Sequence, residues 1–255
     1  MTLPPLTDWM TTCHGLHTVA QVMGRVRKSF IAPQPNALHL TLRVTSHGLT
    51  TGPFTTTSGT HTINADFTTQ QIHAGFAADS FPMTQGGLNA LINAAEAEAE
   101  NGLREGEAPP EITIDAGHAA DYARAQYAVF TALARFRARL GGRITPLALW
   151  PHHFDQSFLY FISGDGDEHN DPHLNFGFAP YSETITRPYL YMYAWPMPEG
   201  ITAQPLPTPA EWVTDDWNGV MLPYDKLVDD ADPQATIEAV CAAVFDVFVQ
   251  HMDGA

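Results

Sequence analysis

Two long amphipathic segments, each followed by short alternating segments, constrain the fold of this chain most strongly. In residues 7–31 apolar side chains recur every three or four positions, as on one face of a helix. Residues 118–140 repeat this pattern, and the two segments stop at the breakers Pro33 and Gly141. Further helices are predicted over residues 85–103 and 233–251. A chain of this kind buries its helix faces by packing them on sheets or on other helices.

The segments between these helices have the length and composition of short strands. Residues 38–44 alternate apolar and polar side chains strictly, which predicts a half-buried strand. We predict the other strands near residues 49–56, 60–67, 70–76, 112–114, 145–151, 156–163, 173–178, 189–195 and 217–222. Residues 196–209 are rich in proline and are expected to follow an irregular surface path.

The order helix, four strands, helix occurs twice, which predicts an α+β fold with two antiparallel sheet units flanked by helices. A linker near residues 105–110 divides the chain into an N-terminal α-β4-α unit, residues 1–104, and a C-terminal α-β4-α unit, residues 105–255. We expect the two to pack as one globular domain. Both long helices end in Arg-x-Arg, an echo that indicates either an internal duplication or convergent patterning of two amphipathic helices.

The charge balance excludes broad classes of partner. With 12 basic and 28 acidic residues the chain is acidic, with a formal charge of −16, and its only lysines are Lys28 and Lys226. It therefore lacks the cationic face that binds nucleic acid or an anionic membrane surface. The sequence has no signal-peptide pattern and no apolar run near the roughly 20 residues that span a bilayer. We expect a cytoplasmic monomer or homodimer, with Cys13 and Cys241 as buried thiols.

Residues 150–155, with the sequence Trp-Pro-His-His-Phe-Asp, concentrate titratable groups directly after an apolar run. On a strand, His153 and Asp155 would share one face and His152 would point to the other. A carboxylate two positions from an imidazole can orient it for acid–base work, so His153 and Asp155 are the candidate catalytic pair. A structural hydrogen-bonded His–Asp pair at a strand end is the competing interpretation.

The first predicted helix carries a polar stripe opposite its apolar one. The candidate ligand-binding residues are His17, Gln21, Arg25 and Arg27 from this helix, together with His152. An arginine in a cavity can grip a carboxylate or a phosphate, whereas the alternative is an ordinary solvated helix face.

Residues 165–173 add further His and carboxylate side chains of the type that binds Zn²⁺, Fe²⁺ or Mn²⁺. The sequence contains no H-E-x-x-H motif, no EF-hand spacing, no P-loop and no G-x-S-x-G elbow. We therefore assign no metal site and leave any cofactor undetermined.

Several motifs together resemble a bacterial family catalogued as domain of unknown function family 5996. They are Trp9, Leu16-His17, Gln21, Gly24-Arg25, Arg27, Gly48-Leu49-Thr50-Thr51, Asp66-Phe67, Trp150-Pro151-His152-His153-Phe154-Asp155, Asn175-Phe176-Gly177-Phe178, Tyr191-Met192-Tyr193-Ala194-Trp195-Pro196 and Gly219-Val220-Met221-Leu222-Pro223-Tyr224. The chain departs from the family pattern at Asn36-Ala37-Leu38, where Asn-His and bulky aromatic residues are expected. The resemblance covers nearly the whole chain and implies no reaction.

Three functions stay open on the sequence alone, and whether the protein is an enzyme is undecided. The leading hypothesis is a protein that binds or transforms a small molecule at a His/Asp/Arg-lined cavity between the two halves. The first alternative is a metal-dependent hydrolase or oxygenase with His and Asp ligands. The second is a non-catalytic interaction protein that uses the proline-rich segment and exposed aromatic residues.

Overall fold

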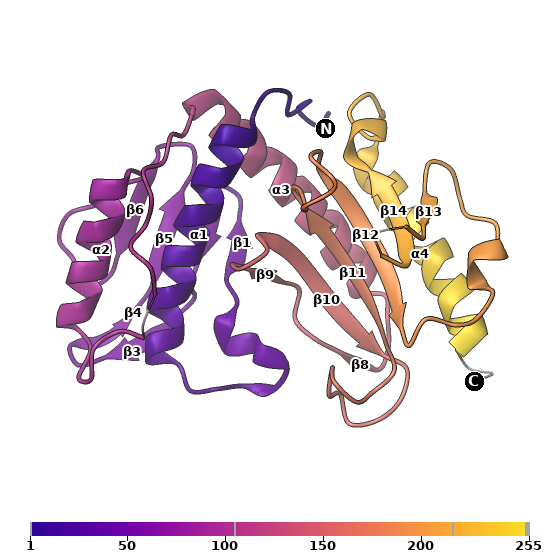
Figure 1. The fold of residues 1–255 in the computed structure, drawn as a ribbon, viewed down its shortest axis with the longest axis horizontal. Coiled ribbons are helices and arrows are strands. Elements are labelled where there is room, and N and C mark those ends of the chain that lie inside the picture. Colours follow the sequence, from indigo (N-terminus) through magenta and orange to yellow (C-terminus); the bar gives the residue numbers. More distant parts are fainter. Residues whose placement is uncertain (1, 105, 216, 253–255) are drawn as a thin grey trace. The chain divides into compact units, whose positions relative to one another are not determined.

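The computed structural model describes residues 2–104, 106–215 and 217–252, and it confirms the predicted α+β class (Figure 1). The α-helices of these residues are α1 (Met10–Phe30), α2 (Gln85–Ala97), α3 (Ala116–Arg137) and α4 (Pro233–Met252). Three short 3-10 helices accompany them: η1 (Pro35–Leu40), η2 (Ile201–Ala203) and η3 (Tyr224–Lys226). The strands form antiparallel sheets.

The chain divides into two compact units, which are described separately. One, called here the C-terminal unit, consists of Met1–Pro5, Ala128–Leu147 and Asp155–Ala255; the other, the N-terminal unit, consists of Leu6–Tyr127 and Ala148–Phe154. The predicted boundary after residue 104 falls inside the N-terminal unit, because the first half of α3 belongs to that unit. Residue 105, the first of the predicted linker, lies outside the described residues.

The N-terminal unit contains a five-stranded sheet with the order β1-β2-β5-β6-β7 and a separate β3-β4 hairpin. Their bounds are β1 (Arg43–Thr45), β2 (Gly48–Thr50), β3 (Phe54–Thr56), β4 (Gly59–His61), β5 (Ile63–Asp66), β6 (Gln71–Ala74) and β7 (Phe81–Pro82). Helices α1 and α2 pack beside each other in front of these strands in Figure 1. The predicted apolar stripe of α1 is buried at Leu16, Val19, Met23 and Val26.

Residues 38–44 do not form the predicted strand, although they alternate strictly. Instead η1 continues through residue 40, and Asn36 and Ala37 within it both adopt φ 51°, in the left-handed region. The guanidinium of Arg27 donates to two carbonyl groups of this segment, those of residues 38 and 39. These carbonyls therefore bind a side chain instead of a neighbouring strand, and β1 begins only at Arg43.

Other elements are shorter than predicted, for identifiable reasons. Strands 49–56 and 60–67 are each split in two, and the helix predicted over residues 85–103 ends at Ala97. The next residue, Glu98, turns its carboxylate to the β3-β4 hairpin, where it accepts a hydrogen bond from Thr56 at 2.6 Å. Residues 112–114 form no strand, and Ile114 lies close to α1, where a Cβ added at Gly15 would be 2.7 Å from its side chain.

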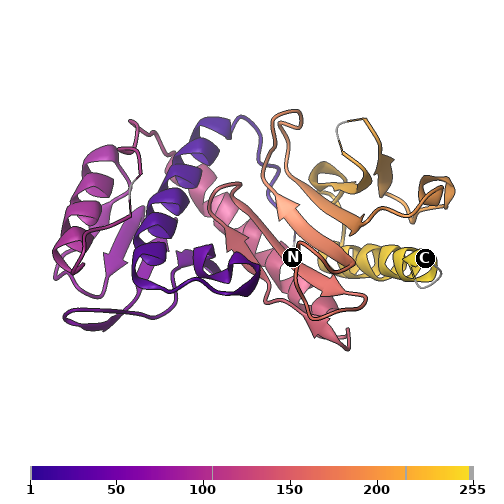
Figure 2. The ribbon, with the colours of Figure 1, turned by 60° about the horizontal axis from the view of Figure 1, so that its bottom comes forward.

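The C-terminal unit contains an antiparallel sheet with the order β13-β14-β12-β11-β10-β8. The bounds are β8 (Arg143–Ile144), β10 (Asp155–Phe161), β11 (His173–Ala179), β12 (Tyr189–Trp195), β13 (Glu211–Val213) and β14 (Gly219–Pro223). One face of this sheet packs on the second half of α3 and on α4 (Figure 2). Phe136 of α3 lies 5.0 Å from Phe176 of β11, and Phe245 of α4 lies 4.9 Å from Tyr160 of β10, between ring centroids.

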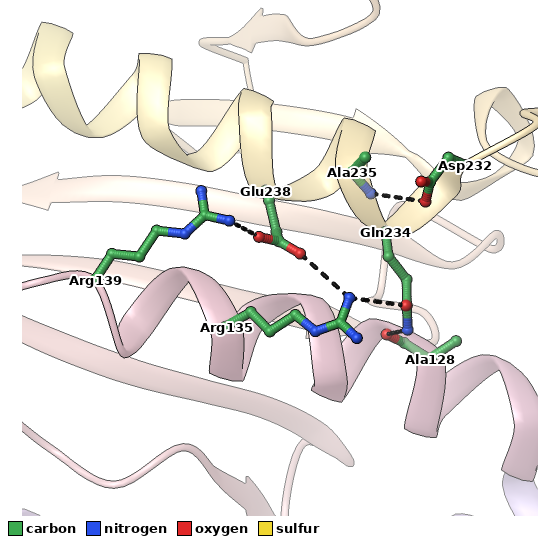
Figure 3. Close-up of polar contacts among 7 residues, drawn as sticks. All are labelled: Ala128, Arg135, Arg139, Asp232, Gln234, Ala235 and Glu238. Atoms are coloured by element: carbon green, nitrogen blue, oxygen red, sulfur yellow. Dashed lines mark hydrogen bonds and ion pairs between the residues drawn. The ribbon is translucent and has the colours of Figure 1, made fainter.

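A buried carboxylate joins α3 to α4. Glu238 of α4 accepts a hydrogen bond from Arg139 and lies 3.6 Å from Arg135, and its side chain is only 9% exposed (Figure 3). Gln234 adds a hydrogen bond of 2.9 Å to the carbonyl of Ala128.

By length and composition α4 also meets a weak criterion for a membrane-crossing helix, which core helices of soluble proteins meet as well.

The Arg-x-Arg echo has the same structural role in both places. Arg27, near the end of α1, donates from Nε to the carbonyl of Thr51 at 2.9 Å. Arg137, at the end of α3, donates from Nε to the carbonyl of Thr145 at 2.7 Å. In each case the second arginine fixes backbone that follows its helix, which is consistent with either interpretation of the echo.

Candidate functional site

The segment with the two histidines is a turn and not the predicted strand. Strand β9 (Ala148–Trp150) ends before it, and the N–H of Phe154 donates to the carbonyl of Trp150 at 2.8 Å. Phe154 adopts φ 59° although it is fully buried, a left-handed conformation that costs a bulky residue on the order of 1–3 kcal/mol. The strand alternation that would place His153 and Asp155 on one face is therefore absent.

His152 and His153 are both exposed at this turn, with ring centroids 4.1 Å apart. Partial burial lowers the pKa of His152, and the charge of His153 adds to this effect. Asp155, by contrast, begins β10 in the C-terminal unit, is 8% exposed, and accepts a hydrogen bond from Tyr191. The prediction that His153 and Asp155 act as one pair thus loses the strand geometry on which it was based.

His17 and Gln21 do lie beside the turn, within the N-terminal unit. The imidazole of His17 donates from Nε2 to the carbonyl of Pro151 at 2.9 Å, and its ring stacks on Phe154 at 5.3 Å. Gln21 Nε2 lies 3.2 Å from His17 Nε2. Burial lowers the pKa of His17, although the backbone hydrogen bonds of the turn oppose this shift. The contacts support a structural role for His17 in holding the strained turn against α1.

Arg25 and Arg27 bind the protein's own backbone. Arg25 donates from Nε to the carbonyl of Arg104 at 3.1 Å and from Nη1 to the carbonyl of Glu107 at 3.4 Å. Arg27 is 9% exposed and donates to the carbonyls described above. Arg25 thus directs two of the five N–H donors of its guanidinium to backbone carbonyls, and Arg27 directs three. Structural anchoring is therefore the better-supported role for both arginines, and the sequence-based interpretation of them as ligand-binding residues stays untested.

The C-terminal unit has a polar sheet face that the sequence did not single out. Its strands are paired so that every second residue of β10, β11 and β12 shares the face opposite α3 and α4. We call this the tyrosine face. Its polar members are Asp155, Ser157, His173, Asn175, Tyr189, Tyr191 and Tyr193, and Leu159, Phe161, Gly177, Ala179 and Trp195 share the same face. The helix-covered face carries mainly apolar residues, among them Phe158, Phe176, Phe178, Leu190 and Met192. The tyrosine face thus carries more polar side chains than the helix-covered face, on which Gln156 and Tyr160 are the polar residues of these three strands.

Tyr191 crosses the central strand of this face to reach Asp155. It is paired with Gly177 of β11, which in turn is paired with Ser157 of β10. A Cβ added at Gly177 would lie 2.2 Å from Cζ of Tyr191, so the phenol end of the ring occupies the space above the glycine. The glycine thereby allows the Tyr191 hydroxyl to donate to the buried Asp155 carboxylate on β10.

Asn175 leaves one hydrogen-bonding position open on the same face. Its Nδ2 donates to the Tyr193 hydroxyl at 2.8 Å. Its Oδ1 is buried, because the residue is only 8% exposed, and it has no hydrogen-bond partner. Such a group costs roughly 1–3 kcal/mol unless a partner is supplied from outside the chain. Oδ1 of Asn175 is therefore a buried acceptor for which the described residues supply no donor.

Aromatic rings surround these polar groups. Trp217 meets Tyr191 edge-on, with centroids 6.5 Å apart and an interplanar angle of 83°, and its Nε1 is buried without a hydrogen-bond partner. Tyr191 and Tyr193 are parallel within 13° at 6.2 Å. At the end of β12, Trp195 stacks on His173 at 5.6 Å and is 42% exposed. The face thus combines flat apolar surfaces with a few directed polar atoms, as small-molecule sites do.

The Asp155 charge influences the whole tyrosine row. Burial raises the pKa of Tyr191 well above its ordinary value of 10.0, and the charge of Asp155 raises it further. Burial also raises the pKa of Tyr189 and Tyr193, and the same carboxylate contributes to both shifts. All three phenols therefore stay protonated at neutral pH and act as neutral hydroxyl groups.

Sequence reasoning missed Asn175, Tyr191 and Tyr193 as site residues. The Tyr-x-Tyr-x-Tyr alternation of residues 189–193 was present, but it also fits aromatic residues in a sheet core. The signal was the polar pair at the start of each neighbouring strand, Asp155 and Ser157 in β10 and His173 and Asn175 in β11. Only the strand register brings these separate alternations onto one surface.

Two other candidate chemistries have little support. Among the described residues, no group of three or more His, Cys, Asp or Glu side chains is placed to hold a metal ion. On the exposed β3-β4 hairpin, Ser58 Oγ lies 2.9 Å from His61 Nε2 and also donates to Glu98. In a catalytic triad the carboxylate binds the imidazole, whereas here it binds the serine. We assign no nucleophile to this cluster.

The sequence was compared with known proteins. Comparison with curated proteins and with solved structures finds no significant match. The model of a family of unknown function, DUF5996, matches residues 2–253, which is nearly the whole chain and includes both the turn at His152 and the tyrosine face. The resemblance inferred from the sequence motifs is thereby confirmed, and this chain belongs to the DUF5996 family.

Proposed function

We propose that this protein is a cytoplasmic small-molecule binding protein whose ligand contacts the tyrosine face of the C-terminal unit. The observation that carries the proposal is the open acceptor of Asn175 beside the Tyr191–Asp155 hydrogen bond. The acidic charge of the chain supports a soluble partner over nucleic acid or an anionic membrane.

The free-energy cost of burying polar side chains on this face supports a functional role for the face over a purely structural one. Asp155, Ser157, His173 and Asn175 are each at most 8% exposed. Burying such groups is unfavourable unless each is hydrogen-bonded, and apolar residues of similar volume would stabilise a sheet face at least as well. Rings and a few directed polar atoms on a rigid sheet are what a binding site requires.

A titration monitored by amide NMR tests the proposal with a matched set of probes. The probes are phenylalaninamide, which is cationic, N-acetylphenylalaninamide, which is neutral, and N-acetylphenylalanine, which is anionic. We expect at least one of them to cause saturable shifts of amides in β10, β11 and β12. The Asn175→Leu variant should lose these shifts, whereas Asn170→Leu, in the exposed loop before β11, should keep them.

Two results would oppose the proposal. The first is the absence of saturable shifts with all three probes at millimolar concentration. The second is binding that Asn175→Leu leaves unchanged, because the probe then sits elsewhere. Circular dichroism of the variant establishes that its fold is retained before the titrations are compared.

A further inference from the structure

The polar groups of the tyrosine face indicate the chemical class of the ligand. Asn175 donates one N–H of Nδ2 to Tyr193, and its buried atom without a hydrogen-bond partner is the acceptor Oδ1. Trp217 Nε1, close to Tyr191, is a donor without a hydrogen-bond partner. A ligand that satisfies both atoms brings one N–H or O–H donor and one acceptor.

The charges on this face favour a cation. Asp155 supplies a carboxylate, and no Lys or Arg occupies a position of β10, β11 or β12 on this face, all of whose residues are described. The imidazole of His173 also lies on this face, and its Nδ1 donates to the carbonyl of Asp171 at 2.9 Å. A carboxylate in a poorly solvated environment interacts with a positive charge much more strongly than it would in water.

The arrangement of the rings also suits a cation. Tyr191 and Trp217 meet nearly at a right angle, with ring centroids 6.5 Å apart. Tyr193 lies parallel to Tyr191 and extends the aromatic surface along β12. Ammonium groups bind over the faces of Trp and Tyr rings, and perpendicular rings are the walls of known cages for such groups.

We infer that the ligand of the tyrosine face is a small organic ammonium compound that also carries a hydrogen-bond acceptor. The ammonium group lies over Tyr191 and Tyr193, within the field of Asp155, and donates to Oδ1 of Asn175. The acceptor receives the N–H of Trp217. This inference rests on the proposed function and adds the substrate class.

The test compares affinities for the three probes by isothermal titration calorimetry of the full chain. Phenylalaninamide should bind about tenfold more tightly than its neutral N-acetyl analogue, and the anionic N-acetylphenylalanine should bind most weakly. Asp155→Asn keeps an oxygen that accepts from Tyr191 but removes the charge, so it should abolish the tenfold preference. Asp165→Asn changes the net charge equally at a fully exposed side chain and should leave the preference intact.

The outcomes separate this inference from the proposed function. Equal or tighter binding of the neutral or anionic probe, still lost in Asn175→Leu, overturns the ammonium assignment and leaves a small-molecule site. A preference for phenylalaninamide that survives Asp155→Asn also overturns it. Binding of none of the probes opposes the proposed function itself. If Asp155→Asn does not fold, Trp217→Phe, which removes the indole N–H, should weaken phenylalaninamide binding, and unchanged affinity overturns the assignment.

Discussion

Replacing Gly177 by alanine tests the geometry of the tyrosine face. The added Cβ would meet Cζ, Oη and Cε1 of Tyr191 at 2.2, 2.4 and 2.7 Å, and real Cβ contacts below 3.0 Å are essentially never seen. The ring must therefore be compressed or must swing away from Asp155. Compression costs about 1–3 kcal/mol, and loss of a hydrogen bond to a carboxylate costs about 1.5–3 kcal/mol.

The variant is expected to relax by whichever change costs less free energy, compression of the ring or loss of its hydrogen bond, so the two costs do not add. Alanine also restricts the unfolded chain, which returns about 0.4–1 kcal/mol of stability. We expect Gly177→Ala to lower the free energy of unfolding by about 1–2 kcal/mol, measured by urea denaturation. Gly141→Ala, whose Cβ meets nothing within 4 Å, is the matched control and should cost little or nothing.

A double-mutant cycle with Tyr191→Ala shows whether this cost arises from the ring. The three nearest atoms to the added Cβ all belong to Tyr191, so Gly177→Ala should cost almost nothing once that side chain is removed. An equal cost in both backgrounds would show that the added methyl group clashes with something other than Tyr191. An unchanged free energy in the single variant would contradict the expected clash with Tyr191 as well.

Three further changes have definite expected outcomes. Glu238→Gln removes a carboxylate shared by two arginines and should lower the free energy of unfolding by about 1 kcal/mol. This loss should be smaller at high salt, and Glu199→Gln, at an exposed loop residue, should leave the free energy of unfolding unchanged. Burial and Asp155 raise the pKa of Tyr191 above 10.0, so the protonated phenol contributes to the stability of the folded protein below that pH, and this contribution is lost as the pH rises further. In urea denaturation, Tyr191→Phe should therefore lose less stability than the unchanged protein as the pH rises above 10.0. Arg27→Lys cannot keep the forked contacts to backbone carbonyls and should destabilise by about 1–3 kcal/mol, whereas a change below about 0.5 kcal/mol in thermal unfolding would contradict the anchoring role.

Periodicity predicted the helices well because their apolar faces are truly buried. The stripe of α1 and the apolar face of α4 are both in the core. Strand β12 was predicted with its observed bounds, residues 189–195. The strand predicted over residues 38–44 does not form as predicted. Alternation alone does not show where backbone carbonyls find partners, and here Arg27 binds the carbonyls of residues 38 and 39.

The candidate site was predicted only in part, for a related reason. Asp155 was predicted to form an acid–base pair with His153, whereas the hydrogen-bond partner that the structure gives it is Tyr191. The turn before Asp155 rests on a left-handed Phe154, which no propensity rule anticipates for a bulky residue. Tyr191 lies 36 positions further on and reaches Asp155 across Gly177, a contact that depends on strand register.

Binding of a small molecule at the tyrosine face can be observed through intermolecular nuclear Overhauser effects between phenylalaninamide and the full chain. We expect contacts from the probe to ring protons of Tyr191 and Trp217, and their loss in Asn175→Leu. Contacts confined to residues outside β10, β11, β12 and Trp217, or contacts that persist in Asn175→Leu, would contradict this expectation.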